Sequence, residues 1–315
     1  MVINGKKIAD ELIQDLKIKF NSLEKKKFFG AMLVLENKES ENFLKQKEKI
    51  AKELNIDFRI YKISENITTD KLRDEIQKIA YHKTCGGFTV QLPLPDHINT
   101  YYVLNAIPSQ KDVDVLSERS LGGFYTERLK IFPPAVSVLE EIIKRQNIDL
   151  KNLNVAVIGY GFLVGKPISF YLSSKVKSIS IFTSKDIDLK QRLKEFDLIV
   201  SGVGKAGLFS SKDLKENAIV IDFGYDFDSN GKIYGDFLYE KDKEIIYTPT
   251  PGGTGPILVA KLFENFYLLN QWFKNINFKK FSARGARLPS SRGDPCLPAG
   301  RLLRRKKYKS LIKFK

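Results

Sequence analysis

Short apolar segments alternate with helical segments along the chain, and this alternation restricts the possible folds most strongly. Strands are expected at 31–35, 57–63 and 87–91, with helices at 40–54 and 69–81 between them. Strands that are joined through helices run parallel in one sheet, and such sheets bind ligands at the carboxyl ends of their strands. The first half of the sequence therefore predicts an α/β domain whose loops carry the function.

The second half continues this alternation around a cluster of glycines. A helix expected at 133–146 leads to the buried strand NVAVI at 154–158, and GYGFLVGKP follows at once with Gly159, Gly161 and Gly165. Glycines at such a turn let a pyrophosphate reach the amide groups at the start of the next helix. With further strands expected at 178–182, 197–200 and 218–223, the pattern predicts a Rossmann-like, doubly wound dinucleotide-binding domain.

The residues after the strand at 178–182 bear on the choice of cofactor. An acidic residue that binds the ribose of NAD is expected about twenty residues after the glycines. The sequence places Thr183, Ser184 and Lys185 there, before Asp186. Hydroxyls and a cation suit the extra phosphate of NADP, so the sequence favours NADP while NAD stays open.

A rigid segment, TPTPGGTGP at 248–256, lies between a strand-like EIIY and a helical run from Ile257. Its three prolines fix φ, and its three glycines let a flat ligand approach the backbone closely. A lone PGG is more often an ordinary tight connection. The length and placement of this segment favour a ligand-facing loop, and hence an enzyme.

The net charge of +16 is unevenly distributed. Residues 279–315 hold 13 of the 53 basic residues and one of the 37 acidic ones, which leaves the rest of the chain at about +4. This Gly, Pro, Ser and Arg-rich tail is expected to be disordered, with contact to RNA or another acidic surface as the alternative. The body of the chain lacks the charge of a nucleic-acid-binding domain.

The remaining composition fits a cytoplasmic protein. Cys85 and Cys296 are far apart and show neither a disulfide pattern nor a metal-ligand spacing. The start of the chain reads as an amphipathic helix rather than a signal peptide, and no apolar run is long enough to span a membrane. His82 and His97 lack spaced partners and are expected to be surface or packing residues.

Five segments taken in order resemble one family. The segments ESENFLKQK, GGFTVQLPLP, KDVDVL, GYGFLVGKP and YTPTPGGTGP resemble the FolD family of methylenetetrahydrofolate dehydrogenase/methenyltetrahydrofolate cyclohydrolases, over about residues 2–275. The resemblance implies oxidation of methylenetetrahydrofolate with NADP and hydrolysis of the methenyl product to formyltetrahydrofolate. It also implies a homodimer that acts in one-carbon metabolism and purine biosynthesis, and no metal.

The resemblance assigns roles to residues position by position. Lys47 would be the central catalytic lysine, hydrogen-bonded by Gln91, with Asp114 gripping the pterin and Phe43 stacking on the folate. The substrate site would contain Phe43, Gln91, Leu92, Pro93, Asp114, Pro251, Gly252 and Gly253. The cofactor site would contain Gly159, Tyr160, Gly161, Gly165, Ser184 and Tyr225.

The sequence departs from the family pattern at four places. Phe43 replaces a tyrosine and so lacks a phenol hydrogen bond, Val115 replaces the glycine of KDVDG, and PPAVSV at 133–138 replaces PCTPxG. Tyr160 and Gly161 replace the usual Arg and Ser, which removes expected phosphate ligands. Two alternatives follow: a dehydrogenase with impaired hydrolysis, and a silent folate- or nucleotide-binding protein whose tail binds an acidic partner.

The expected organisation is therefore α/β with two domains. Residues 1–137, closed by a helix at 257–278, form the folate-binding catalytic domain. Residues 138–256 form the Rossmann-like NADP-binding domain. Residues 279–315 form the basic tail.

Overall fold

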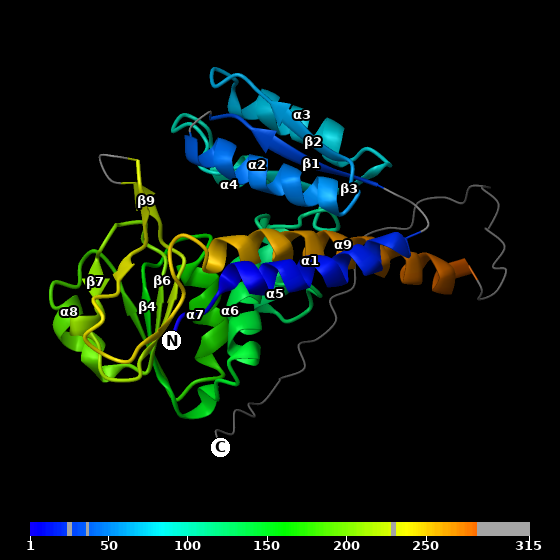
Figure 1. Ribbon diagram of the computed structural model, residues 1–315. Coiled ribbons are helices and arrows are strands. Elements are labelled where there is room, and N and C mark those ends of the chain that lie inside the picture. The colour runs from blue at the N-terminus through cyan, green and yellow to red at the C-terminus, as the bar shows by residue number, and fades with distance from the viewer. Residues whose placement is uncertain (24–26, 36–37, 228–230, 282–315) are drawn as a thin grey trace, which may run out of the picture.

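The computed structural model describes residues 1–23, 27–35, 38–227 and 231–281. Figure 1 shows a smaller lobe built on one sheet and a larger lobe built on a second sheet, with two long helices running side by side between them. These helices are α1 (Gly5–Asn21) and α9 (Thr254–Phe281), from opposite ends of the described chain. Most of the predicted tail, including Cys296, lies outside the described residues.

The first lobe contains a three-stranded parallel sheet in the order β2-β1-β3. Its elements are β1 (Phe28–Leu33), α2 (Lys38–Glu53), β2 (Phe58–Lys62), α3 (Thr69–Ala80), β3 (Cys85–Val90), α4 (Thr100–Leu104) and α5 (Glu118–Tyr125). The side chain of Thr68 accepts a hydrogen bond from the Lys71 amide and so begins α3. The central strand β1 is buried along its whole length, which suits a strand covered on both faces.

The second lobe contains a five-stranded parallel sheet in the order β12-β8-β6-β4-β5. Its main elements are α6 (Pro134–Arg145), β4 (Asn154–Ile158), α7 (Gly165–Ser173), β5 (Ser178–Phe182), α8 (Leu189–Arg192), β6 (Leu198–Ser201), β8 (Ile219–Asp222) and β12 (Ile246–Tyr247). The chain adds β5 on one side of β4 and then β6, β8 and β12 on the other side, as in a doubly wound sheet. The predicted Rossmann-like fold is confirmed.

Short elements complete the second lobe. Two-residue strands form an antiparallel pair and a parallel pair beside the main sheet, and single 3₁₀ turns connect larger elements. They are β7 (Phe209–Ser210), β9 (Asp226–Phe227), β10 (Ile233–Tyr234), β11 (Phe237–Leu238), η1 (Leu150–Asn152), η2 (Leu193–Glu195) and η3 (Ser211–Asp213).

The start of the chain is attached to the second sheet. Ile3 donates its amide hydrogen to Tyr247 O (2.7 Å), and Tyr247 donates its own to Met1 O (3.0 Å). Val2 lies beside Tyr247 in a parallel bridge at the edge strand β12. The chain then enters α1, so α1 is anchored in the second lobe before it crosses toward the first.

The helices α1, α6 and α9 share a core, and a partly buried ion cluster joins α6 to α9. Phe29 of β1 stacks on Phe266 of α9 with ring centroids 5.1 Å apart. Lys261 of α9, which is buried, donates to Glu141 of α6 (2.7 Å) and to Glu264 (2.8 Å). Paired in this way, the buried charges are compensated and tie α9 to α6.

The sequence misplaces the ends of the first strand. The predicted strand at 31–35 begins at Phe28 and ends at Leu33. Phe28 pairs with Cys85 of β3, and β3 itself begins before the predicted 87–91. Pairing with β3 thus extends β1 toward its amino end, while the apolar Val34 and Leu35 lie beyond its last paired residue.

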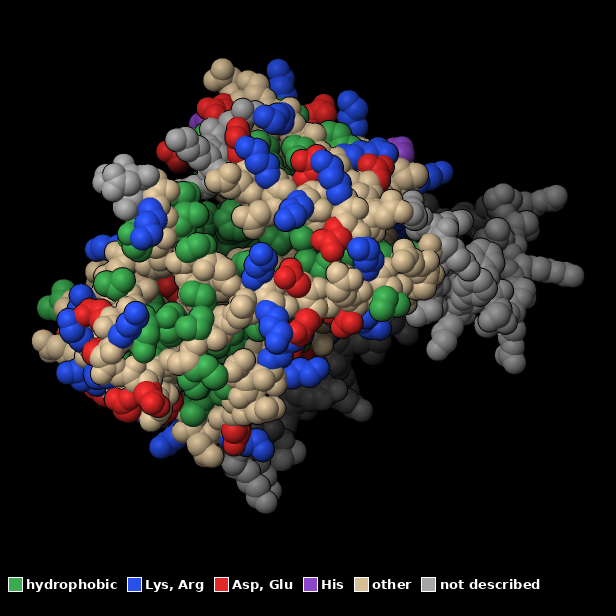
Figure 2. Space-filling model, viewed as in Figure 1, with side chains coloured by type: hydrophobic (Ala, Val, Ile, Leu, Met, Phe, Trp, Pro, Cys, Tyr) green, Lys and Arg blue, Asp and Glu red, His purple; other side chains and the backbone are tan. Residues whose placement is uncertain are grey.

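Basic and acidic side chains are interspersed over the face of the molecule that Figure 2 draws, while hydrophobic side chains gather on the second lobe. This distribution agrees with the near balance of charge outside the tail. Among the described residues, no helix is long and apolar enough to cross a membrane.

Candidate active site

The predicted catalytic lysine lies buried at the carboxyl end of the first sheet. Lys47 of α2 is 6% exposed, and its Nζ donates a hydrogen bond of 3.2 Å to Oε1 of Gln91, which directly follows β3. Burial lowers the pKa of the Lys47 ammonium below its ordinary range, and the nearby Asp114 carboxylate partly offsets this effect. A lysine in this setting can exchange a proton more readily than a surface lysine.

Asp114 completes this cluster and is held by a residue that the sequence analysis missed. Thr89, on β3 and buried, donates its hydroxyl hydrogen to Asp114 Oδ2 in a short contact. Thr89 stands two residues before Gln91, so the same strand fixes both partners of Lys47. The fold thus brings Lys47, Gln91 and Asp114 together, although they are distant in the sequence.

A second missed residue, Asp112, shapes the turn that carries Asp114. Its fully buried carboxylate accepts hydrogen bonds from the Leu116 amide (3.0 Å), the Ser117 amide (2.8 Å) and the Ser117 hydroxyl (2.7 Å). Val115, where the family has glycine, adopts φ of +58° within this turn. Because a β-branched residue resists this conformation, the bonds to Asp112 hold the turn in place. The Val115 side chain packs into the main core.

The loop after β3 begins next to this cluster. Gln91 donates from Nε2 to Leu92 O (3.2 Å), and the Leu92–Pro93 peptide is cis. Leu92 is half-buried and Pro93 is exposed. Both residues therefore follow directly on Gln91, at the edge of the Lys47 cluster.

The proline-glycine segment lies against the start of α1. The Thr250–Pro251 peptide is cis, Gly252 has φ of +96°, and the Gly252 carbonyl accepts from the Lys6 amide (3.1 Å). A Cβ on Gly253 would lie 2.4 Å from Pro249 O, so a side chain has no space there. The predicted rigid loop is thus present, with Pro251 exposed.

The glycine loop after β4 leaves the start of α7 accessible to an anion. Gly159 has φ of +90°, and a Cβ on Gly165 would lie 2.0 Å from Gly159 O, so the first turn of α7 closes on the strand only with glycine there. No side chain caps α7 at Val164. The Lys166 amide already donates to Gly161 O (3.0 Å) and Pro167 has no amide hydrogen, so the glycine-rich backbone before α7 and the helix dipole are what suit the pyrophosphate of a dinucleotide. Tyr160 and Gly161, in the same loop, are exposed, and Gly161 has open space around it.

We expect Gly165→Ala to weaken binding of a reduced nicotinamide nucleotide by about tenfold or more, since its methyl group would displace the Gly159 carbonyl. Fluorescence titration measures this affinity. Gly122→Ala, in α5 with open space at the Cβ position, is the matched control. Equal affinities of wild type and Gly165→Ala would contradict this role of the loop.

The residues after β5 form a turn around Asp186. Thr183 donates to Asp186 Oδ2 from its amide (2.7 Å) and from its hydroxyl (3.2 Å), while Ser184 and Lys185 are exposed. The Asp186 carboxylate is therefore bonded within its own turn. This arrangement leaves a hydroxyl and an ammonium outermost at the predicted ribose end.

Two buried carboxylates, which the sequence analysis also missed, organise the loops at the carboxyl end of the second sheet. Asp236 accepts from the Ser201 hydroxyl (2.6 Å), the Val203 amide (2.8 Å) and the Lys205 amide (2.7 Å). Asp222 accepts from the Gly224 amide (2.8 Å) and the Phe237 amide (3.0 Å). Burial, together with the charge of Asp236, raises the pKa of Asp222 to about 7.

This raised pKa predicts a stability that falls as pH rises. The folded chain holds a proton on Asp222 up to about pH 7, whereas the ordinary pKa is 3.8, so the contribution is full below 3.8 and is lost as pH rises through about 7. Thermal and urea unfolding should show a loss of about 2 to 3 kcal/mol between about pH 5 and pH 8 from this group. Asp222→Asn should flatten that slope, and an unchanged slope in the variant would contradict the assignment.

Tyr225, the remaining predicted cofactor residue, follows β8 and lies against the first lobe. Its ring packs on that of Phe43 with centroids 5.6 Å apart and planes tilted by 54°. Phe43 stands one helical turn before Lys47 on α2, and both rings are half-buried. This contact joins the two lobes beside the Lys47 cluster.

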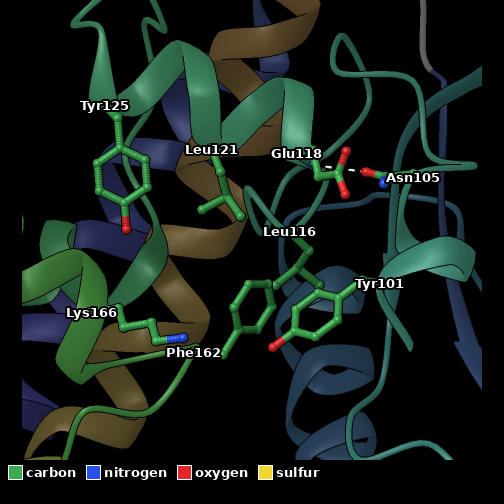
Figure 3. Close-up of a pocket in the computed structure, with 8 residues that line it drawn as sticks. All are labelled: Tyr101, Asn105, Leu116, Glu118, Leu121, Tyr125, Phe162 and Lys166. Atoms are coloured by element: carbon green, nitrogen blue, oxygen red, sulfur yellow. Dashed lines mark hydrogen bonds between the residues drawn. The ribbon is translucent and has the colours of Figure 1, made fainter. Parts of the chain in front are cut away.

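A separate cavity of about 260 Å³ lies between the lobes, on the α4 and α5 side of the glycine loop. Figure 3 shows Tyr101, Tyr125 and Phe162 turned toward it, with Lys166 of α7 at one end and Glu118 at another. Tyr101 meets Phe162 edge to face at 5.4 Å, a second aromatic contact between the lobes. Lys47, Gln91 and Asp114 do not line this cavity, whereas Phe162 and Lys166 belong to the glycine loop and the first turn of α7, so the cavity adjoins the predicted cofactor site.

Comparison with known families agrees with this geometry. Residues 3–114 match the model of the tetrahydrofolate dehydrogenase/cyclohydrolase catalytic domain, and residues 133–273 match that of its NAD(P)-binding domain. The chain belongs to the tetrahydrofolate dehydrogenase/cyclohydrolase family. The family resemblance seen in the sequence is confirmed.

Relatives of this family align over nearly their whole length. The bifunctional protein FolD of Staphylococcus carnosus is 34% identical over 272 residues, which cover 85% of this chain and 95% of the relative. The crystal structure of the Campylobacter jejuni bifunctional enzyme FolD superposes with a TM-score of 0.81 at 30% identity, covering 87% of this chain and 99% of that one. The Trypanosoma brucei FolD, complexed with NADP and an inhibitor, gives 0.82 at 25% identity, with coverage of 87% and 98%.

Proposed function

We propose that this member of the tetrahydrofolate dehydrogenase/cyclohydrolase family oxidises methylenetetrahydrofolate with NADP and hydrolyses the methenyl product to formyltetrahydrofolate. The observation that carries this proposal is the buried Lys47, hydrogen-bonded to Gln91 and close to Asp114, one helical turn from the Phe43 ring that packs on Tyr225 of the dinucleotide-binding lobe. An arrangement of this kind combines a proton-exchanging amine with a surface for a flat ring.

The dehydrogenase step chiefly needs two rings held face to face. NADP, when bound, supplies the acceptor for the hydride that leaves the one-carbon bridge. Gly159, Gly165 and the uncapped start of α7 would hold its pyrophosphate, with Tyr160, Gly161 and Tyr225 beside it. Pro251, Gly252 and Gly253 would line the folate side, while Asp114 would accept hydrogen bonds from the pterin.

Hydrolysis needs a water molecule to attack the cationic methenyl carbon. The water oxygen bonds to that carbon, one carbon–nitrogen bond breaks, the freed nitrogen keeps one proton, and one proton is released overall. Lys47 suits these proton transfers because burial lowers the pKa of its ammonium group and favours the neutral amine. The Gln91 oxygen fixes the position of the Lys47 ammonium or amine through its 3.2 Å hydrogen bond.

The preference for NADP over NAD is supported by the residues after β5. Ser184 and Lys185 are exposed there, and the Asp186 carboxylate is turned back onto Thr183. A 2′-phosphate would find a hydroxyl and an ammonium rather than a free carboxylate. The ratio of kcat/KM for NADP to that for NAD measures this preference.

The test mixes purified protein with methylenetetrahydrofolate and NADP, then with NAD, and follows the reduced-nicotinamide and methenyl absorbance bands. Growth of both bands, with decay of the methenyl band faster than in buffer, is the expected result. A persistent methenyl band would mean dehydrogenation alone. Silence with both cofactors would overturn the enzyme assignment and favour a binding protein.

The predicted homodimer rests on the family resemblance, and the predicted location rests on the cysteine usage of the sequence. We propose a homodimer in the cytoplasm, acting on folate one-carbon derivatives that serve purine biosynthesis. Light scattering of the purified chain tests the dimer. The predicted domain limits, 1–137 with 257–278 and 138–256, stay a prediction that limited proteolysis can examine.

A further inference from the structure

The contact between Phe43 and Tyr225 bears on the missing phenol of the active site. The family motif has a tyrosine one helical turn before the lysine, where this chain has Phe43. Residues four apart lie on the same face of a helix, so Phe43 and Lys47 face the same space. The departure therefore removes a hydroxyl group from the neighbourhood of Lys47.

The structure places another phenol against this ring. Tyr225 comes from the opposite lobe, and its ring packs on Phe43 at 5.6 Å. Its ring also meets that of Phe227, edge to face at 6.3 Å. The Tyr225 ring, which carries a hydroxyl, thus packs on Phe43, which lacks one.

The segment that carries Tyr225 is firmly held. The preceding Gly224 donates its amide hydrogen to Asp222 Oδ1 (2.8 Å), and Phe223 donates to Ser201 O (2.8 Å). Asp222 in turn is buried at the end of β8. The backbone that leads into Tyr225 is therefore fixed by the end of the sheet.

We propose that Tyr225 supplies, from the second lobe, the phenol that Phe43 lacks, and acts as the hydroxyl partner of Lys47 during hydrolysis of the methenyl cation. The inference rests on the proposed cyclohydrolase function. In this role the phenol donates a hydrogen bond to the neutral Lys47 amine or to the attacking water. The proton released in the reaction passes to Lys47 and then to solvent, and the phenol ends the cycle unchanged.

A Tyr225 phenol that assists Lys47 and a Tyr225 ring that only contacts the cofactor would affect different steps of the reaction. A residue that only contacts the dinucleotide would influence dehydrogenation and nucleotide affinity. A phenol partner of Lys47 influences hydrolysis of methenyltetrahydrofolate even when no nucleotide is added. The two roles therefore separate in an assay that supplies the methenyl compound directly.

The experiment compares the full-length wild type with Tyr225→Phe, and with the double variant Phe43→Tyr/Tyr225→Phe, in hydrolysis of methenyltetrahydrofolate without nucleotide. We expect Tyr225→Phe to lower kcat for hydrolysis by about tenfold or more. The double variant, which returns the phenol to α2, should recover to within about threefold of wild type. Tyr81→Phe, which removes an exposed phenol hydroxyl beyond the end of α3, is the matched control.

Two results would overturn the proposal. One is wild-type hydrolysis by Tyr225→Phe; the other is a loss in Tyr225→Phe that Phe43→Tyr does not restore, which would indicate a structural role of the ring. If the proposed cyclohydrolase function itself were wrong, the result would be different: the wild type would produce a methenyl band with NADP, and that band would not decay. Thermal unfolding of each variant confirms that the chains compared are folded.

Discussion

Replacing Lys47 by methionine should lower the rate of methenyl hydrolysis by about a thousandfold, because the substitution removes the group that exchanges protons with water and product. Methionine matches the length of the lysine stem and carries no charge. It also removes the cost of burying an amine that is charged in the unfolded chain. The variant should therefore fold at least as stably as the wild type.

The measurement is the decay of methenyl absorbance, together with a thermal unfolding curve. Dehydrogenation should fall less than hydrolysis, since hydride transfer depends mainly on how the two rings are placed. Lys49→Met is the control, because Lys49 is exposed on the same helix. Undiminished hydrolysis by Lys47→Met would show that the mechanism is wrong.

How well the sequence predicts this site depends on the range of the interactions involved. The strands β4 and β5 were predicted to the residue, because each is a short apolar run that ends at a glycine or a polar turn. Helix α3 was predicted to within one residue, as 69–81 against the observed Thr69–Ala80. Such signals act over a few residues and can be read locally.

Contacts between distant segments escaped prediction. Asp112 and Asp114 stand two apart in KDVDVL, yet one carboxylate is buried in a turn and the other faces Lys47. Thr89 gives no signal of its own, because only the sheet brings it to Asp114. The family resemblance identified Asp114 but not Thr89 or Asp112, the two residues that hold it in place.

The same limit applies to the second lobe and to the interface. The sequence predicted a strand at 218–223 but gave no role to the Asp222 carboxylate within it, and it made no prediction for Asp236. The packing of Tyr225 on Phe43 joins residues 182 positions apart, and no periodicity reports such a pair. Structure is needed wherever side chains from two lobes meet.

Removing the Asp112 carboxylate should have the largest effect on stability. In Asp112→Ala the Leu116 and Ser117 amides and the Ser117 hydroxyl lose a buried acceptor, and each lost bond to such a group costs about 1 to 3 kcal/mol. The Ser117 hydroxyl keeps Ser120 as a neighbour (2.9 Å), which limits its share. We expect a total loss of about 4 kcal/mol in the free energy of unfolding, measured by urea titration.

The same substitution should also reduce activity in the fraction that remains folded. Val115 is held at φ of +58° by this turn, and once the carboxylate is gone its backbone can relax toward negative φ. That relaxation moves Asp114, one residue away, out of reach of Thr89 and Lys47.

Asp112→Asn, which keeps one acceptor oxygen, should lose about half as much stability as Asp112→Ala. Asp10→Ala, an exposed change on α1, should stay within about 0.5 kcal/mol of wild type. If Asp112→Ala unfolded at the wild-type urea concentration, the turn would be held by its own core packing and not by the carboxylate.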